Sequence, residues 1–288
     1  MKDLNFQLKQ MCEQNRNGSY STQHTRHLIL QDVANQLDAA GFKRMDATSL
    51  KPKHVDWLVE KWKGEDLTHG TIKNRLSAIR WWSGKINKQN VVRRTNEEYG
   101  VEKRCYITNV SKSRELDYQK LAKVSDENIK LSLQLQSAFG LRREEAIKFT
   151  PSFADKGDHI ELKSTWTKGG KSRTVPITTE AQRQLLDTLH EKVGGASLIP
   201  SERNYVEQLR IYERQTLVNG LHKNHGLRHH YAQDRYFVMT ERLAPAAGGK
   251  KSNELTKEEK AQDGIVRLAI SKELGHEREQ VTAIYLGR

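Results

Sequence analysis

The sequence predicts a mainly α-helical protein with two domains and a small antiparallel β-sheet in the second domain. Apolar residues recur at helical spacing through residues 1–90, which is the pattern of amphipathic helices packed on a common core. Residues 116–288 are also mostly helical, but a partly alternating stretch flanks a Gly-Gly pair and predicts a hairpin. Residues 91–115 have mixed charge and no sustained period, so we interpret them as a linker.

The first domain, residues 1–90, is expected to be a bundle of four helices. Pro52 falls in the first turn of the third helix, and Gly41 and Gly64 end the second and third helices. Short loops between amphipathic helices are typical of a small bundle. The expected helices begin near Leu4, Ser21, Pro52 and Thr68.

The second domain, residues 116–288, mixes helix and strand signals. Residues 151–176 have strand character, and Thr179 with Gln182 has the capping-box pattern of a following helix. Residues 244–262 are rich in Gly, Lys and Glu and predict a mobile loop, whereas residues 274–285 predict a short helix, a turn and a second helix. Other helices are expected near residues 117–122, 126–139, 143–149, 181–193, 201–218 and from residue 225.

The formal net charge is +13. Residues 1–105 contain 19 basic and 12 acidic residues, and residues 106–288 contain 30 and 24, so the excess is spread over both halves. This distribution favours a protein that surrounds a polyanion over one with a single basic arm. The two cysteines, Cys12 and Cys105, are too few for a disulfide framework. With no apolar leader and no membrane-length apolar run, we expect a cytoplasmic protein, associated with the nucleoid in a bacterium.

Basic residues in three places are candidates for contact with nucleic-acid phosphates. A basic helix face is most often only solvated, but in a chain of this charge it can lie along a nucleic-acid backbone. The candidates lie on the fourth helix, in the linker and beside the hairpin turn: Lys73, Arg75, Arg80, Arg94, Lys171 and Arg173.

Two arginines are suited to holding a phosphodiester during attack. Arg142 follows the pair Gly-Leu and Arg228 follows His-Gly-Leu, each where a loop is expected to enter a helix. A guanidinium meets two phosphate oxygens at once and stays charged at neutral pH. The ordinary alternative for each residue alone is a solvated surface charge.

A nucleophile, a base and an acid are also available. Tyr285 is the candidate nucleophile; a phenol has a pKa of about 10, so its ionisation at neutral pH costs about 4 kcal/mol and needs a base and a cationic pocket. His225 and His276 are the candidate bases, and Lys168, beside the Gly-Gly turn, is the candidate donor of a proton to the departing hydroxyl. A partly buried tyrosine and a solvated turn lysine are the ordinary alternatives.

A zinc site is the weaker interpretation of the histidine cluster. His225 and His229 have i, i+4 spacing, and His222 and His230 lie nearby. The sequence has no HExxH motif and no cysteine close to the cluster. We therefore expect no metal and no other cofactor, and no nucleotide-binding glycine motif is present.

Five motifs in a fixed order carry a resemblance to a known family. They are GLRREE at 140–145, TKGGKSR at 167–173, HGLRHHYA at 225–232, LGH at 274–276, and Tyr285 nine residues after the last histidine. Together they resemble the tyrosine recombinase (phage integrase) family, sharply over residues 138–288 and loosely over residues 1–90.

The resemblance implies a role for each motif residue. A threonine, Thr167, stands where the family often has glycine, and Glu145 matches an acidic position that supports the site. The implied catalytic residues are Arg142, Lys168, His225, Arg228, His276 and Tyr285.

The resemblance also implies a fold and a reaction. It implies a SAM-like core-binding domain at residues 1–90 and a catalytic domain of the DNA breaking-rejoining fold at residues 116–288, which close on double-stranded DNA. The expected reaction forms a 3′-phosphotyrosyl intermediate without metal or ATP, because the covalent link conserves the energy of the broken bond. Expected partners are DNA, further copies of the chain in a tetramer, and factors that bend DNA or set direction.

Departures from the family and other functions stay open at this stage. Three residues follow Tyr285, residues 240–264 look like an insertion, and no arm-site-binding domain is expected before residue 1. The leading hypothesis is the integrase of a mobile genetic element. The alternatives are a Xer-like resolvase, a DNA invertase, a type IB topoisomerase, and a non-catalytic DNA-binding protein of the same fold.

Overall fold

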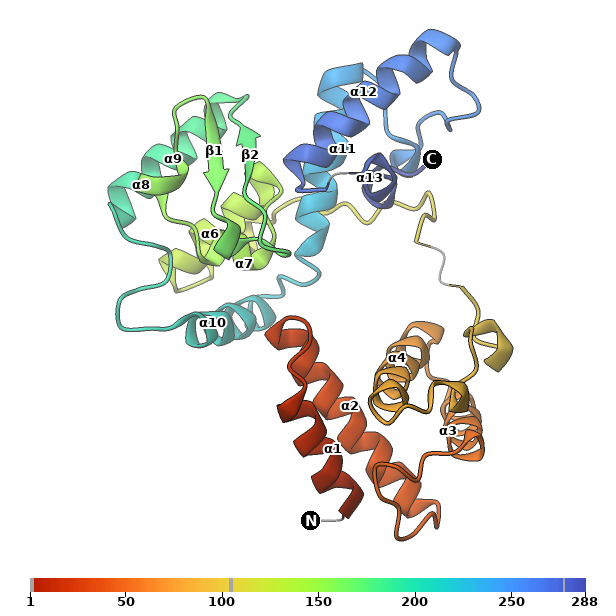
Figure 1. Ribbon diagram of the computed structural model, residues 1–288. Coiled ribbons are helices and arrows are strands. Elements are labelled where there is room, and N and C mark those ends of the chain that lie inside the picture. Colours follow the sequence, from red (N-terminus) through yellow and green to blue (C-terminus); the bar gives the residue numbers. More distant parts are fainter. Residues whose placement is uncertain (1–2, 104–105, 277) are drawn as a thin grey trace. The chain divides into compact units, whose positions relative to one another are not determined.

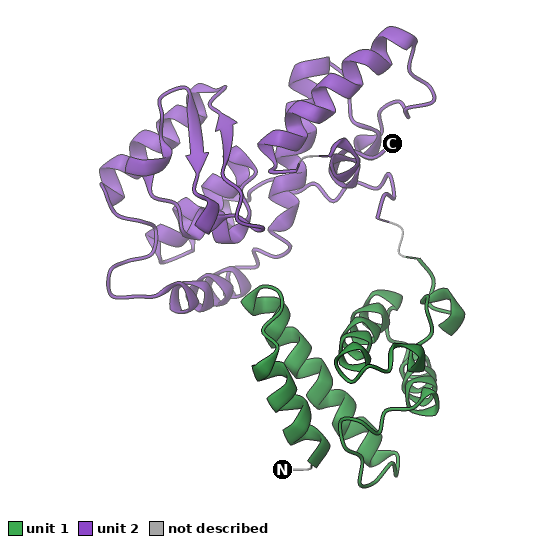
Figure 2. Cartoon of the chain, viewed as in Figure 1, with its two compact units in different colours: residues 1–105 green, residues 106–288 purple. Residues whose placement is uncertain are grey.

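A computed structural model describes residues 3–103, 106–276 and 278–288, which belong to two compact units, residues 1–105 and 106–288 (Figures 1 and 2). The predicted fold class is confirmed: both units are mostly helical, and the second contains a small antiparallel sheet. Among the described residues, no helix has the length and apolar character that a bilayer span requires.

The first unit is the predicted helical bundle. Side chains cap the N-termini of the second and fourth helices. The Ser19 hydroxyl accepts a hydrogen bond from the Thr22 amide at 3.3 Å, and the Thr68 hydroxyl accepts one from the Thr71 amide. Two tryptophans fill the core, and each finds a partner for its indole N–H, since Trp62 donates to Gln36 Oε1 and Trp82 to the Ala47 carbonyl, both at 2.8 Å. The helices are α1 (Asp3–Gln14), α2 (Tyr20–Ala39), α3 (Pro52–Gly64) and α4 (His69–Lys85), followed by the 3-10 turns η1 (Gln89–Val91) and η2 (Glu97–Tyr99).

The structure divides the predicted linker of residues 91–115 between the two units. Val92, Tyr99 and Val101 are buried in the core of the first unit, at 4%, 4% and 1% exposure. Tyr99 ends the 3-10 turn η2, and Val92 and Val101 lie outside helices and strands. Their positions therefore have no regular period, which is why the sequence pattern suggested a linker. Cys12 is half-buried, and burial raises the pKa of its thiol. Cys105 lies outside the described residues.

The second unit is built around a helical core with the two-stranded sheet at one side (Figure 1). Strands β1 (His159–Leu162) and β2 (Arg173–Pro176) pair antiparallel, with His159 opposite Pro176 and Leu162 opposite Arg173. The first half of this unit holds the strands and η3 (Ser164–Trp166), with the helices α5 (Tyr118–Ala122), α6 (Glu127–Phe139), α7 (Arg143–Ile147), α8 (Pro151–Ala154), α9 (Glu180–Val193) and α10 (Tyr205–Val218). The second half holds α11 (His225–Thr240), η4 (Pro245–Ala247), α12 (Lys257–Glu273) and α13 (Glu279–Leu286).

Residues 244–262 are more ordered than the predicted mobile loop. Pro245 and Ala246 are buried in η4, and α12 already begins at Lys257. The cause is a capping box: the Thr256 hydroxyl accepts from the Glu259 amide at 3.2 Å, and the Glu259 carboxylate accepts from the Thr256 amide at 2.9 Å. The predicted turn and second helix at 274–285 match Gly275 at φ +68° and α13, but the helix before the turn is the 17-residue α12, which ends at Glu273, and not a short helix.

Candidate active site

Arg228 and Tyr285 meet in the core of the second unit. Arg228 is the fourth residue of α11 and is 1% exposed, and its Nε donates to the Tyr285 hydroxyl at 3.2 Å. Its two η nitrogens donate to the carbonyls of Gly140 and Leu274. Burial lowers the pKa of Arg228 to about 10, so the guanidinium is still charged at neutral pH and directed at the phenol.

Arg142 contacts the Leu274 carbonyl that Arg228 also contacts. It precedes α7, and its Nη2 donates to the Leu274 carbonyl at 3.2 Å and lies 3.4 Å from His276 Nε2. The guanidinium groups of Arg142 and Arg228 therefore converge on one carbonyl oxygen, that of Leu274. Of the two groups Arg142 is the more accessible, because its side chain is 21% exposed whereas Arg228 is 1% exposed.

A buried carboxylate holds the arginines in place. Glu145 is fully buried and accepts from Arg142 Nη1 at 2.8 Å and from both η nitrogens of Arg173 at 2.7 Å. Burial raises the pKa of the Glu145 carboxyl, but the hydrogen bonds and charge of Arg173, with the charges of Arg142 and Arg228, outweigh burial and bring it to about 2. Glu145 is therefore an anion that fixes two cations.

Three histidine rings surround the Tyr285 ring. The ring centroids of His225, His229 and His276 lie 6.0, 4.7 and 6.1 Å from that of Tyr285. Burial and then nearby positive charges lower the pKa of each histidine, to about 4 for His229 and His276. These rings are neutral at pH 7, and a neutral imidazole can accept a proton.

Lys168 is an exposed residue at the tip of the hairpin, near Gly169 and Gly170, which both have positive φ. It shares a cavity of about 400 Å³ with Arg142 and His276. The structure thus places an exposed lysine at the same opening as one arginine and one histidine of the site. The cavity is lined by Arg142, Thr167, Lys168, Lys171, Ser172, Arg173, Thr174, Lys272, Gly275 and His276.

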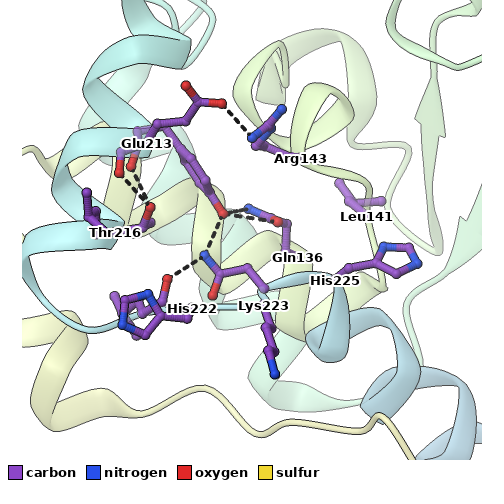
Figure 3. Close-up of a pocket in the computed structure, with 12 residues that line it drawn as sticks. Gln136, Leu141, Arg143, Glu213, Thr216, His222, Lys223 and His225 are labelled. Atoms are coloured by element: carbon purple, nitrogen blue, oxygen red, sulfur yellow. Dashed lines mark hydrogen bonds and ion pairs between the residues drawn. The ribbon is translucent and has the colours of Figure 1, made fainter. Parts of the chain in front are cut away.

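A separate cavity of about 440 Å³ lies behind His225 (Figure 3). Arg143 points across it to Glu213 and forms an ion pair at 3.0 Å, and Gln136 bonds the Tyr212 hydroxyl at 3.2 Å. These pairs join α6 and α7 to α10, so this cavity supports the packing of these helices beside the site.

The predicted DNA-binding residues have different environments. Lys73 and Arg94 are exposed, and the Lys171 side chain lines the cavity at the hairpin. Arg75 pairs with Asp32 at 3.2 Å, and Arg80 donates to Asn96 at 2.8 Å.

Arg173 differs from its predicted role. Its side chain is 7% exposed, all its hydrogen bonds go inward, and its Nε donates to the Glu273 carbonyl at 2.9 Å. The reason is the adjacent buried carboxylate of Glu145, which requires a cationic partner. This geometry favours a positioning role for Arg173 over an exposed contact with DNA.

The histidine cluster is split between different neighbours. The rings of His225 and His229 pack edge to face with centroids 5.4 Å apart, and His230 Nδ1 lies 3.2 Å from the Ser113 hydroxyl. Within the described part of the chain, no three His, Cys, Asp or Glu side chains gather as a metal site requires.

Comparison with known proteins establishes the class. Residues 1–89 match the family model described as phage integrase, N-terminal, and residues 104–234 match the model described as integrase. The chain therefore belongs to the tyrosine recombinase (phage integrase) family. A search of curated protein sequences finds no match.

Solved structures of the family share this fold. The Tn1549 transposon integrase in complex with circular intermediate DNA is 13% identical with a TM-score of 0.57, covering 100% of this chain and 96% of its own. XerH recombinase bound to difH is 19% identical with a TM-score of 0.56, and the alignment covers 98% of this chain and 80% of XerH. Lambda integrase, solved as a dimer bound to a COC′ core site, is 15% identical with a TM-score of 0.63, and the alignment covers 98% of this chain and 76% of lambda integrase. At these identities the similarity establishes the fold.

Sequence reasoning missed some residues of the site. His229 packs closest to Tyr285, but its i, i+4 spacing from His225 suggested only a chelating pair. Lys272, at the end of α12, lines the hairpin cavity, and nothing in the local sequence distinguishes it from other helical lysines.

Proposed function

We propose that this protein is a site-specific DNA recombinase, the integrase of a mobile genetic element, that cleaves and rejoins DNA through a 3′-phosphotyrosyl intermediate. The observation that carries the proposal is the buried contact between Arg228 and Tyr285, with Arg142 on the same Leu274 carbonyl as Arg228 and His276 beside Arg142. A phosphate and a phenol both require such a cationic pocket. The Tn1549 transposon integrase, which shares the fold, was solved in complex with circular intermediate DNA, and lambda integrase was solved bound to a COC′ core site.

In the proposed reaction the Tyr285 oxygen attacks the scissile phosphorus and the 5′-hydroxyl leaves. Arg142 and Arg228 bind the non-bridging oxygens, whose charge grows in the transition state. A neutral histidine, His225 or His276, accepts the phenol proton, and Lys168 donates a proton to the departing oxygen. The ester formed with tyrosine keeps the energy of the broken phosphodiester for rejoining, so the step needs neither ATP nor metal.

In this proposal the two units have different roles. We assign the helical first unit to core-site binding and the second unit to catalysis, on double-stranded DNA in the cytoplasm. A lambda integrase tetramer has been solved on a Holliday junction, which supports strand exchange within a tetramer of this chain as well. Factors that bend DNA or set direction are further proposed partners.

The test is the covalent adduct on a DNA substrate with a nick close to the cleavage site, which traps the phosphotyrosyl product. Tyr285→Phe should form no adduct and still bind DNA, because only the attacking oxygen is lost. Tyr118→Phe, at an exposed tyrosine away from the site, is the matched control and should react like the wild type. Adduct on Tyr285→Phe at the wild-type rate would eliminate Tyr285 as the nucleophile.

A further inference from the structure

Residues 106–117, here called the connector, follow the first unit in the chain and lie along α11. The Arg114 amide donates to the Gly226 carbonyl at 3.1 Å, and the Ser113 hydroxyl lies 3.2 Å from His230 Nδ1. A Cβ at Gly226 would come within 2.8 Å of Arg114 Cγ, so glycine allows this close approach. The connector is therefore fixed to the helix that carries Arg228.

The connector also reaches the main chain of the nucleophile segment, residues 285–288, by two routes. Asn109 forms a reciprocal pair with Arg288: its Nδ2 donates to the Arg288 carbonyl and its Oδ1 accepts from the Arg288 amide, both at 2.7 Å. The Ser111 hydroxyl donates to Gln233 Oε1 at 3.0 Å, and Gln233 Nε2 donates to the Tyr285 carbonyl at 2.9 Å. Both routes end on backbone atoms at or just after the nucleophile.

The same segment has a third, buried anchor on α12. Arg267, 2% exposed, donates from Nη1 to the Gly287 carbonyl at 2.8 Å and pairs with Asp263 at 2.7 Å. Gly287 has φ +76°, and a Cβ there would lie 2.5 Å from Asn109 Oδ1. The nucleophile segment is thus held between α12 on one side and the connector on the other.

We propose that Asn109 and Gln233 are positioning residues, through which the connector holds the nucleophile segment so that the Tyr285 phenol stays at Arg228. The proposal rests on the proposed function. In-line attack needs the reacting atoms about 3–3.5 Å apart, and a displacement of about 1 Å can cost roughly 100-fold in rate. The helix that carries Tyr285 has only eight residues, so its own hydrogen bonds give it little rigidity, and side-chain bonds to residues 285 and 288 supply the constraint.

Asn109→Gly is the sharpest variant. Asn109 has φ +49°, a conformation that glycine adopts without strain, so only the side chain and its two hydrogen bonds are lost. Asn87→Gly is the matched control, because Asn87 also has positive φ, +56°, and is an exposed residue of the first unit. Gln233→Met tests the second route with a side chain of similar length.

The measurement is the rate of adduct formation on the nicked DNA at increasing DNA concentration. Asn109→Gly and Gln233→Met should each slow the rate at saturating DNA about fivefold to tenfold, as expected for the loss of one or two hydrogen bonds. The DNA concentration for half-saturation should not change, and Asn87→Gly should react like the wild type. Amide hydrogen exchange at residues 286–288 should become faster in Asn109→Gly, which a general loss of stability would not confine to these residues.

Distinct results would overturn the two proposals. If the wild type forms adduct and Tyr285→Phe does not, while Asn109→Gly and Gln233→Met keep the wild-type saturating rate, the positioning role is wrong and the proposed function stands. A wild-type protein that binds DNA and forms no adduct would contradict the proposed function itself. Equal slowing in Asn109→Gly and Asn87→Gly would also eliminate the positioning role, because the effect would then belong to the glycine.

Discussion

Arg228 illustrates how a single residue combines structural and chemical roles. Its Nε contacts the Tyr285 hydroxyl, and its other nitrogens bind the carbonyls of Gly140 and Leu274. Buried arginine is costly unless its donors are paired, and here main-chain oxygens provide the pairing. The guanidinium is thereby held at the Tyr285 hydroxyl, as the proposed reaction requires.

Glu145 is the residue on which this arrangement most depends. Glu145→Gln should destabilise the second unit by about 3–5 kcal/mol at pH 7, because a neutral amide leaves the buried guanidinium of Arg173 without a counter-charge. The measurement is urea unfolding followed by circular dichroism. Glu213→Gln, which breaks the exposed ion pair with Arg143, is the matched control and should cost at most about 1 kcal/mol.

The stability difference between wild type and Glu145→Gln should also depend on pH. The folded pKa of Glu145 is about 2, below the 4.5 of an ordinary glutamate, so the unfolded chain binds the proton more readily. The contribution of Glu145 is therefore complete above pH about 4.5 and is lost as the pH falls toward 2. A difference that stays constant from pH 7 to pH 2 would show that the Glu145 charge does not stabilise the fold.

At the scale of elements, the β1–β2 hairpin connects local sequence to the opening of the site. Gly169 and Gly170 adopt positive φ, and the Thr167 hydroxyl closes the turn on the Lys171 carbonyl at 2.6 Å. The strands fix the base of the turn by their register, while Lys168 at the tip is exposed. A lysine on such a turn can approach a bound phosphodiester and withdraw from it.

Lys168→Ala should slow adduct formation about 100-fold if this lysine donates the proton to the leaving oxygen. A substrate with sulfur in place of the bridging 5′-oxygen should restore the rate, because a thiol with a pKa of about 8.5 leaves as the anion without a proton. Lys171→Ala, at the same cavity, is the control and should gain nothing from sulfur. Equal rates for Lys168→Ala on the oxygen and sulfur substrates would argue against Lys168 as the acid.

Local patterns predicted most elements, and their failures have physical causes. The four helices of the first unit, the hairpin and the turn after α12 all have short-range signals in apolar spacing, glycine and capping residues. The start of α12 was missed because the Gly- and Lys-rich composition of 244–262 obscured the capping pair Thr256 and Glu259.

The candidate site also contains residues that local sequence predicts and contacts that it does not. The motif residues could be predicted because they lie in recognisable runs such as GLRREE. The inward direction of Arg173 and the pair of Asn109 with Arg288 could not, because they depend on packing between distant segments, 179 residues apart for that pair. Charge and residue type predict that an arginine binds an anion but do not say whether the anion is Glu145 or a phosphate.

At the scale of the whole molecule, positive charge belongs to both units and not to one surface element. Some of the basic side chains form ion pairs inside their own unit, as Arg75 does with Asp32 and Arg173 with Glu145. Each such pair is already cancelled in the formal net charge of +13, so pairing lowers the number of basic side chains free to contact a polyanion below the total of 49 Lys and Arg. Lys73 is exposed, and we predict that it strengthens DNA binding by releasing a counterion from a phosphate.

The difference between exposed basic residues and those in internal ion pairs is measurable in the salt dependence of DNA affinity. The logarithm of the association constant should fall linearly with the logarithm of salt concentration, with a slope of about −0.9 for each phosphate neutralised. Lys73→Ala should make the slope shallower by about one if Lys73 contacts a phosphate, whereas Lys9→Ala, at a lysine paired with Glu13 on α1, should leave it unchanged. A full-chain affinity that does not respond to salt would contradict binding of a DNA backbone by both units, since each counterion released must appear in the slope.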